Sequence, residues 1–266
     1  MTVKHTPMVQ AVDVWKSFGG LDVLKGINLE VMPGTVTCII GPSGSGKSTF
    51  LRCVNHLEKV SAGRLYVDGE LIGYRERDGV LYEMSEKDAA KQRRDIGMVF
   101  QNFNLFGHRT VLENIIEAPV HVKGEDPARA KARAMELLAM VGLESKAGAY
   151  PIQLSGGQQQ LIRQAQALAN DPELILADEP LLSLDPARQQ ATVDKLDALR
   201  RERGTSIMFV THGINPVLGV TDKVLYLAPG GHTFGTVDEV MRSDVLSELY
   251  GSKVNVLNVD GRLIVV

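Results

Sequence analysis

One short segment near the start of the chain has the residue types needed to hold phosphate. Residues 41–49 read GPSGSGKST, a glycine, four residues and then Gly-Lys-Ser, which is the pattern of phosphate-binding loops. Glycines allow tight turns that point backbone N–H groups at phosphate oxygens, the lysine supplies a point charge, and the serine hydroxyl suits Mg²⁺. The motif indicates an NTPase or a kinase. The residues expected to contact the nucleotide are Gly41, Ser43, Gly44, Ser45, Gly46, Lys47, Ser48 and Thr49.

A pair of acidic residues further along could activate water. Residues 174–179 read LILADE, an apolar strand that ends in two carboxylates, and open α/β sheets bind their ligands at this end of the strands. Asp178 is suited to hold Mg²⁺, directly or through water, and Glu179 is suited to orient and polarise an attacking water. A solvated acidic pair at a strand end is the alternative, but the phosphate loop favours the catalytic interpretation.

The phosphate loop and the acidic pair need a framework in which strands and helices alternate, which is typical of α/β proteins. Helices are expected from about Lys47, from Asp126-Pro127, and from Asp185-Pro186 to about Gly204, since Asp caps a helix and Pro fits its first turn. The polar stretch 74–94 is expected to hold a short helix. Strands are expected at Val9–Val14, Leu24–Val31, Thr35–Ile40, Arg64–Leu71, Ile96–Phe100, Leu174–Ala177 and Ile207–Thr211.

Two Asp-Gly dipeptides predict tight hairpin turns. Asp68-Gly69 lies within the strand-like segment 64–71, and Asp260-Gly261 lies in the alternating tail 254–266. The tail is therefore expected to form a terminal hairpin.

Composition fits a globular protein without a membrane span. The chain has 266 residues and a formal net charge of −3 at pH 7, so wholesale nucleic-acid binding is not indicated. No run approaches the roughly 20 apolar residues that cross a bilayer, and Met1–Val9 lacks the apolar region of a secretory signal. Cys38 and Cys53 stand in apolar surroundings and are expected to be buried free thiols. We therefore expect a cytoplasmic protein that reaches a membrane only through a partner.

Residues 154–158 read LSGGQ, and with this pentapeptide the sequence resembles the ABC (ATP-binding cassette) ATPases. A helix is expected to open at Ser155, where free backbone N–H groups could hold an anion; an ordinary capped helix is the alternative. The resemblance implies an α/β P-loop NTPase fold with a RecA-like core sheet, an antiparallel β subdomain and an inserted helical subdomain. It also implies that the γ-phosphate held by the opposite subunit is bound by Ser155, Gly156, Gly157 and Gln158.

Further motifs follow in the order that the resemblance requires. Phe18, in KSFGG, matches the aromatic residue that stacks on adenine, with a core phenylalanine as the alternative. Gln101, in MVFQNFNLF, matches the glutamine that touches Mg²⁺ or water and senses the transporter, with a surface glutamine as the alternative. Asp185, in SLD, matches the loop that crosses to the other subunit and also looks like a helix cap. His212, in FVTHG, matches the histidine that contacts the γ-phosphate.

The resemblance implies a complete set of roles and partners. ATP and Mg²⁺ are the expected cofactors, with metal ligands Ser48, Gln101 and Asp178. A second copy of the chain, or a related ATPase subunit, would close head to tail over the nucleotide, and membrane permease subunits would dock on the helical part. No nucleic-acid partner is expected, and the protein would lie at the inner face of the cell membrane. The residues expected to act in catalysis are Glu179, His212, Lys47 and Gln101.

The resemblance also implies a division of one nucleotide-binding domain, residues 1–266, into four parts. Residues 1–101 would form the N-terminal part of the core with the antiparallel β subdomain, and residues 102–160 the helical signature subdomain. Residues 161–253 would complete the core, and residues 254–266 the C-terminal hairpin.

The sequence resembles two different groups of importers before and after the LSGGQ pentapeptide, the signature of the ABC ATPases. The stretch 14–160 is similar to ATPases of polar amino-acid importers, whereas the stretch from about Ile162 is similar to ATPases of zinc or manganese importers. We therefore expect an ATPase that powers import of polar amino acids or metal ions, in a chain joined from two subfamilies near residues 154–165. Misfits are expected at Leu161 and Gln164. Soluble ABC ATPases of DNA repair or translation, and P-loop kinases, are the rival classes.

Overall fold

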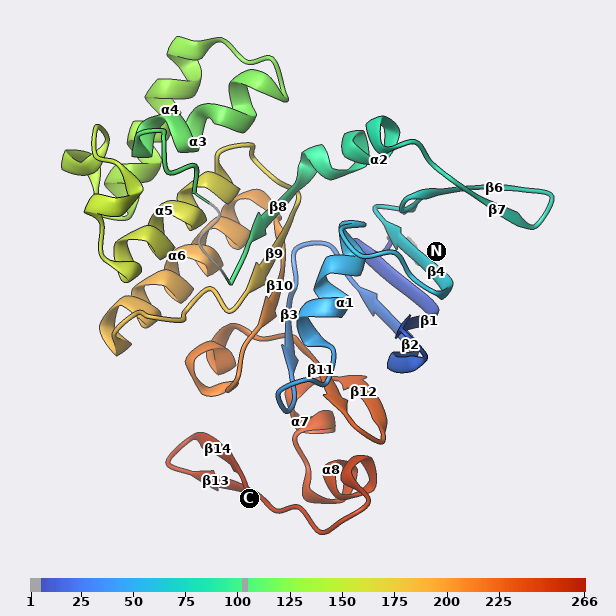
Figure 1. Cartoon of the computed structure of the whole chain (residues 1–266). Helices are drawn as coiled ribbons and strands as arrows, with labels where there is room; N and C mark the ends of the chain where they lie inside the picture. Colours follow the sequence, from blue (N-terminus) through green and yellow to red (C-terminus); the bar gives the residue numbers. More distant parts are fainter. Residues whose placement is uncertain (1–5, 102–104) are drawn as a thin grey trace, which may run out of the picture.

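The computed structural model describes residues 6–101 and 105–266, which form two main sheets and two separate hairpins with helices around them (Figure 1). The larger sheet has the strand order β12-β11-β3-β10-β9-β8, and the smaller has the order β2-β1-β4-β5. In the larger sheet β3, β8, β9, β10 and β11 run parallel, and β12 (Gly231–Gly235) is antiparallel to β11. The smaller sheet is antiparallel throughout.

The strands of the larger sheet are β3 (Val36–Ile40), β8 (Ile96–Val99), β9 (Leu174–Asp178), β10 (Ser206–Val210), β11 (Lys223–Ala228) and β12. The smaller sheet contains β1 (Val9–Phe18), β2 (Leu21–Val31), β4 (Ala62–Val67) and β5 (Glu70–Leu71), and separate hairpins are formed by β6 (Tyr74–Arg77) with β7 (Val80–Glu83) and β13 (Val256–Val259) with β14 (Arg262–Val265). The α-helices are α1 (Lys47–Val54), α2 (Glu86–Gln92), α3 (Val111–His121), α4 (Pro127–Met140), α5 (Gly156–Leu168), α6 (Pro186–Arg203), α7 (Val237–Val240) and α8 (Ser243–Tyr250). Short 3₁₀ turns are η1 (Arg93–Asp95), η2 (Glu144–Lys146), η3 (Pro151–Gln153) and η4 (Asn215–Val220).

The central strands form where the sequence is mostly apolar. Every residue of β3, β9 and β10 is buried, as expected for parallel strands that are covered on both faces. The predicted strands are confirmed, with boundaries that shift by a few residues. The largest shift is β1, which continues from Val14 to Phe18.

Helix caps follow the local chemistry that predicted them. The Asp126 carboxylate accepts hydrogen bonds from the backbone N–H groups at the start of α4, and the Asp185 carboxylate does the same for α6. Gly204 ends α6 with φ of 71°, a left-handed conformation that glycine adopts without strain. The predicted starts of both helices and the end of α6 are confirmed.

Asp-Gly turns are confirmed at both predicted positions. Asp68-Gly69 and Asp260-Gly261 have positive φ at both residues, which suits the right-handed twist of the strands they join. The prediction for 74–94 was incomplete, because β6 and β7 form a hairpin ahead of the short helix α2. Asp78-Gly79, with φ of 51° and 78°, makes that turn. It is the same dipeptide signal, but the strands on either side, YRER and VLYE, lack an alternation of apolar and polar residues.

Two apolar clusters hold the sheets and helices together. One lies between the larger sheet and the helices α3 to α6, and contains Cys38. The other contains Cys53 and joins the opposite face of the larger sheet, the smaller sheet and α1, which stands between the two sheets in Figure 1. Both cysteines are buried free thiols, as predicted, and burial raises the pKa of Cys53 to about 12.

Helices α3, α4 and α5 stand together at one end of the larger sheet (Figure 1). The predicted first residues of this helical part, 102–104, lie outside the described residues, as do residues 1–5. Over the part of the chain that the structure describes, no helix combines the length and apolar character needed to cross a membrane.

Candidate functional site

The phosphate loop connects β3 to α1, and its glycines are required by the local backbone. Gly41 has φ of 142°, and a Cβ atom at this position would lie 2.0 Å from the carbonyl oxygen of Leu227. Gly46 caps α1 with φ of 94°, and a Cβ atom there would lie 2.8 Å from the Leu24 side chain. The loop therefore passes too close to its neighbours for any larger residue at either position.

Lys47 begins α1 and turns its side chain back over the loop. Its Nζ donates hydrogen bonds to the carbonyl oxygens of Gly41 at 2.9 Å and Pro42 at 2.8 Å, and the side chain is buried. Burial lowers the pKa of Lys47, while the nearby charges of Glu179 and Asp178 act to raise it. The ammonium group is therefore placed between the loop and the two acids.

The other loop residues are exposed to solvent, are half-buried, or have a side chain without a hydrogen bond among the described residues. Ser43 and Gly44 are exposed, and Thr49 is half-buried within α1. Ser45 donates its backbone N–H to Pro42 O at 3.3 Å, but its buried hydroxyl has no hydrogen-bond partner among the described residues.

Asp178 and Ser48 meet at the end of β9. The Ser48 hydroxyl donates to Asp178 Oδ1 at 2.7 Å. Asp178 Oδ2 is buried without a hydrogen bond among the described residues, and its nearest cation is Arg52, with Nη2 at 3.9 Å. A hydroxyl beside a carboxylate with a spare oxygen is a donor set that Mg²⁺ accepts.

Glu179 lies next to this pair in an unusual backbone conformation. Its φ is 51°, rare for a non-glycine residue, and its N–H donates to Val210 O at 2.9 Å. The side chain is buried, and Oε1 lies 2.8 Å from Nε2 of the mostly exposed His212. These two residues meet because β9 and β10 are parallel neighbours that pair Asp178 with Val210.

The signature helix α5 begins as predicted. Ser155 caps it by accepting from the Gln158 N–H, and the Gln158 side chain accepts from the Ser155 N–H. Gly156 faces open space, whereas a Cβ atom on Gly157 would lie 3.2 Å from the carbonyl oxygen of Ser183. Ser183 itself has φ of 65°, so two strained or tight positions lie where α5 approaches the loop before α6.

Three further predicted site residues lie on other elements. Phe18 ends β1 and is 45% exposed, with Lys16 Nζ 4.4 Å from the centre of its ring. Asp185 is exposed at the start of α6, with its carboxylate 3.4 Å from Arg188 Nε. Gln101 follows β8, and its carbonyl oxygen accepts a hydrogen bond from Arg163 at 3.1 Å.

Buried polar side chains on α5 were missed as functional candidates. Gln160, Arg163 and Gln164 are each at most 5% exposed and bond to the backbone after β8 and β9. The available signal was their i, i+3 and i+4 spacing. The prediction that Gln164 and Leu161 are misfits was wrong, because Gln164 Nε2 donates to Pro180 O at 3.0 Å and Leu161 packs against the core.

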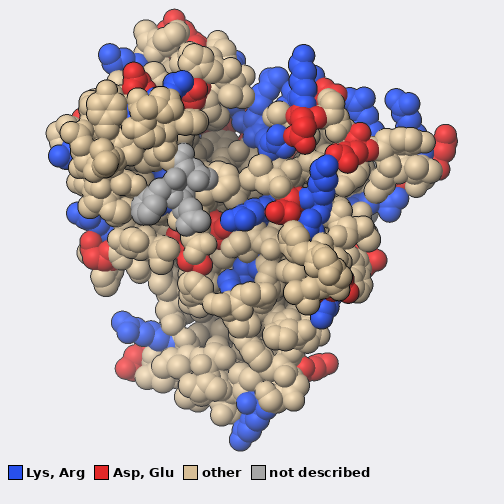
Figure 2. All heavy atoms as spheres, in the orientation of Figure 1, with Lys and Arg blue, Asp and Glu red and all other residues tan. Residues whose placement is uncertain are grey.

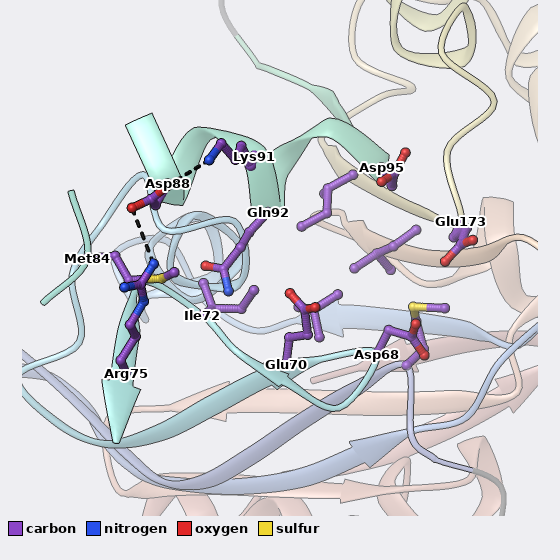
Figure 3. A pocket seen from close by; sticks show the side chains of 14 residues that line it. Asp68, Glu70, Ile72, Arg75, Met84, Asp88, Lys91, Gln92, Asp95 and Glu173 are labelled. Atoms are coloured by element: carbon purple, nitrogen blue, oxygen red, sulfur yellow. Dashed lines mark hydrogen bonds and ion pairs between the residues drawn. The ribbon is translucent and has the colours of Figure 1, made fainter. Parts of the chain in front are cut away.

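A separate cavity of about 450 Å³ is lined by residues of the smaller sheet, of α2 and of the starts of β8 and β9 (Figure 3). Its walls include Ile96 and Leu174, the first residues of β8 and β9, whereas the phosphate-binding groups lie at the other ends of the strands. Asp68, Glu70 and Glu173 line its rim. Nearby, blue and red side chains are interspersed over α2 and the β6–β7 hairpin (Figure 2). This cavity is not part of the nucleotide site.

A phosphate loop between β3 and α1, with a carboxylate pair at the end of a parallel strand nearby, defines a P-loop nucleoside triphosphatase. The family model for the ABC transporter matches residues 24–182, and the chain belongs to this family. It is an ATP-binding and ATP-hydrolysing subunit that powers an ABC transporter.

Curated relatives agree with this assignment. The chain is 63% identical to the arginine transport ATP-binding protein ArgV of Corynebacterium glutamicum over 223 residues, which cover 84% of this chain and 87% of the relative. It is 43% identical to the histidine/lysine/arginine/ornithine transport ATP-binding protein HisP of Salmonella typhimurium over 224 residues, 84% of this chain and 86% of that protein.

Solved structures confirm the predicted fold class. The ATP-binding cassette MJ0796, in a dimeric post-hydrolysis state bound to ADP and Pi, has a TM-score of 0.77 and 36% identity, covering 86% of this chain and 99% of that chain. CbiO1 of Clostridium perfringens, part of the ABC transporter complex cbiONQ, has a TM-score of 0.75 and 28% identity over 90% of this chain and 92% of that chain.

The comparisons do not support a junction between two subfamilies. The alignment with ArgV covers 84% of the chain, which is more than either expected part, so it crosses residue 160. The two curated relatives, ArgV and HisP, are amino-acid transport proteins and not zinc or manganese transporters. The hydrogen bond of the buried Gln164 and the packing of the partly buried Leu161 against the core likewise give no support to a misfit at the expected boundary.

Proposed function

We propose that this chain energises uptake of a polar amino acid, with a cationic side chain as the first candidate. The support is the names of its relatives, which transport arginine in one case and histidine, lysine, arginine and ornithine in another. Metal-ion import, the alternative from the sequence, has no such support. The chain would act at the inner face of the cell membrane, bound to permease subunits through the helical part that includes α3 and α4.

The observation that carries the proposed chemistry is the meeting of four side chains beside the phosphate loop. Ser48 and Asp178 are 2.7 Å apart, and Glu179 and His212 are 2.8 Å apart, on neighbouring elements. Ser48 and Asp178, with Gln101 nearby, would hold Mg²⁺. The ion would neutralise charge on the phosphate oxygens of ATP.

The protein groups then have separate tasks. Glu179 orients and polarises the attacking water, and Lys47 and His212 stabilise the negative charge that develops on the transferred phosphoryl group. Phe18 supports adenine, and the backbone of the phosphate loop, from Gly41 to Thr49, surrounds the phosphates. Positioning and charge stabilisation supply most of the catalysis in this class of reaction.

Two chains would be needed for each complete ATP site. The signature residues Ser155, Gly156, Gly157 and Gln158 would bind the γ-phosphate held by a partner copy, and Asp185 would lie at the same interface. Such a dimer is two-fold symmetric and uses the same surface twice. The division into parts 1–101, 102–160, 161–253 and 254–266 belongs to this proposal, with the helical part moving when the dimer closes.

Sedimentation velocity of the Glu179→Gln variant tests the dimer. With ATP and Mg²⁺ this variant should sediment as a dimer, because slow hydrolysis keeps ATP in the interface. The matched control adds Lys47→Ala, which weakens ATP binding and should keep the protein monomeric. A Glu179→Gln variant that stays monomeric at saturating ATP would count against the sandwich arrangement.

Uptake in proteoliposomes tests the substrate class. The membrane subunits that co-purify with this chain would be reconstituted with it and with their binding protein, and labelled arginine, glutamine and Zn²⁺ compared as substrates. ATP-dependent uptake of arginine is the expected result. Uptake of Zn²⁺ alone would overturn the amino-acid proposal but leave the ATPase assignment intact.

A further inference from the structure

Three buried polar side chains on α5 connect two loops of the active site. Gln160, Arg163 and Gln164 are 1%, 5% and 5% exposed. They lie on one face of the helix because their spacing is i, i+3 and i+4. Burying a guanidinium and two amides is costly unless each is hydrogen-bonded, so their partners show what this face of the helix holds.

Arg163 holds the segment that carries Gln101. Its Nη1 donates to the carbonyl oxygens of Phe100 at 2.8 Å and Gln101 at 3.1 Å. Hydrogen bonds from an ionised donor are roughly twice as strong as those between neutral groups. The chain leaving β8 is therefore fixed to α5 through its backbone, whatever its side chains do.

Gln160 holds the segment that carries Glu179. Its Nε2 donates to Pro180 O at 2.9 Å and lies 3.5 Å from Glu179 O. Gln164 Nε2 donates to the same Pro180 oxygen at 3.0 Å. Glu179 has the left-handed φ of 51°, and such a conformation persists only when surrounding contacts maintain it.

Arg163 also sets the orientation of Gln160. The Arg163 Nη2 donates to Gln160 Oε1, which directs the amide nitrogen of Gln160 at the carbonyl oxygens of Glu179 and Pro180. The bridge therefore runs from the carbonyl of Gln101 through Arg163 and Gln160 to the carbonyl of Glu179. It spans strands β8 and β9 just beyond their last ladder pair, Val99 with Ala177.

We propose that Arg163 is a positioning residue for ATP hydrolysis, which acts by fixing the segments of Gln101 and Glu179 relative to one another through Gln160. It touches neither ATP nor the reacting water. The inference rests on the proposed roles of Glu179 and Gln101, and it adds a determinant of turnover located in α5, the helix that begins within the LSGGQ pentapeptide.

The test compares single-turnover ATP hydrolysis and ATP affinity in the full-length chain with Mg²⁺. Arg163→Met keeps the volume but removes the donors, and it should slow hydrolysis about 10- to 100-fold, since displacement of reacting groups by about 1 Å has effects of this size. The Kd for ATP should stay near the wild-type value, because the phosphate loop is untouched.

Gln166→Met is the matched control. Gln166 lies on the same helix and donates one hydrogen bond, to Asn114 O at 3.1 Å, on the side of α3. This variant should hydrolyse ATP at the wild-type rate even if its thermal stability falls by as much as that of Arg163→Met. An equal loss of activity in both variants would reduce Arg163 to a structural residue.

Two further variants keep the proposal testable if Arg163→Met folds poorly. Arg163→Lys retains one donor toward the carbonyls of Phe100 and Gln101 and should recover part of the rate. Gln160→Leu should slow hydrolysis, and its effect should not multiply with that of Arg163→Met, since both break one bridge. Fully multiplicative effects would contradict action through Gln160.

Glu179→Gln, measured in parallel, separates the two proposals. If it is inactive while Arg163→Met and Gln160→Leu hydrolyse ATP normally, the positioning role is overturned and the proposed function stands. If Glu179→Gln itself hydrolyses ATP at the wild-type rate, both fall, because Arg163 is proposed to act on that carboxylate.

Discussion

Replacing Glu179 by glutamine isolates the charge of one buried carboxylate. Glutamine has nearly the same shape, and its side-chain oxygen can still accept from His212 Nε2, which lies 2.8 Å from Oε1 of Glu179. The backbone at φ of 51° is no harder for glutamine than for glutamate. Fold and contacts should therefore survive, and only the ability to polarise water is lost.

The size of the effect follows from the role of the carboxylate as a positioned base. Such groups contribute about 10²- to 10⁴-fold to rate, which corresponds to about 3–5 kcal/mol of activation free energy. ATP affinity should be unchanged or higher, because Glu179 is one of two negative charges close to Lys47 and the phosphate loop. The turnover rate should thus fall while the affinity for ATP does not.

Single-turnover release of phosphate at saturating ATP and Mg²⁺ measures the chemical step, and equilibrium titration with ATP measures affinity. Glu173→Gln is the matched control, because Glu173 precedes the same strand β9 at its other end and is exposed. The control should behave as wild type. A Glu179→Gln protein that releases phosphate as fast as the control would refute the assignment of the base.

Three other perturbations test the structure around the site. Gly41→Ala should lower the free energy of unfolding, measured by urea titration, by at least about 2 kcal/mol, because the added Cβ atom would lie 2.0 Å from a carbonyl oxygen. Gly148→Ala is the control: its Cβ atom would meet no atom within 4 Å, so the free energy of unfolding should hardly change. Burial lowers the pKa of His56 below its ordinary value of 6.5, so as the pH falls the unfolded chain takes up a proton on this side chain before the folded protein does. The contribution of neutral His56 to stability should therefore be complete above pH 6.5 and decrease below it. The His56→Gln variant should accordingly show a shallower decline of Tm in acid. Asn215→Ala removes two hydrogen bonds to the backbone of Leu263, worth about 0.5–1.5 kcal/mol each, and should speed proteolysis of the C-terminal hairpin without changing that of α6.

Sequence reasoning located the phosphate loop and the acid pair because their chemistry is local. The motif that contains Gly41, Gly46 and Lys47 and the acid pair at the end of β9 are each patterns of a few consecutive residues, so their types and spacing predict the site. The hairpin turns and the caps at Asp126 and Asp185 were predictable for the same reason. These features depend on a few consecutive residues.

The bridge on α5 could not be predicted in this way. Arg163 and Gln160 bond to carbonyl groups about 60 and 20 residues away in the sequence, and backbone carbonyls carry no side-chain identity that a motif could reveal. The sequence instead made Gln164 look like a misfit in the core. Its hydrogen bond to Pro180 O shows why a polar residue is satisfied there. The β6–β7 hairpin was missed for a different reason, since its short strands are mostly exposed and lack an alternation of apolar and polar residues.

Helix α1 packs against both sheets, and this packing links its local unfolding to that of the smaller sheet. Phe50 and Leu51 are fully buried in a cluster that includes side chains of both sheets, such as Val9 from β1 and Leu176 from β9. The helix that begins with Lys47 therefore cannot unfold without uncovering the antiparallel sheet. Ligand binding at its first turn raises the free energy of every opening that releases the ligand. Bound ATP should thus slow amide hydrogen exchange in β1 and β4 as well as in the phosphate loop, making the smaller sheet part of the same cooperative unit.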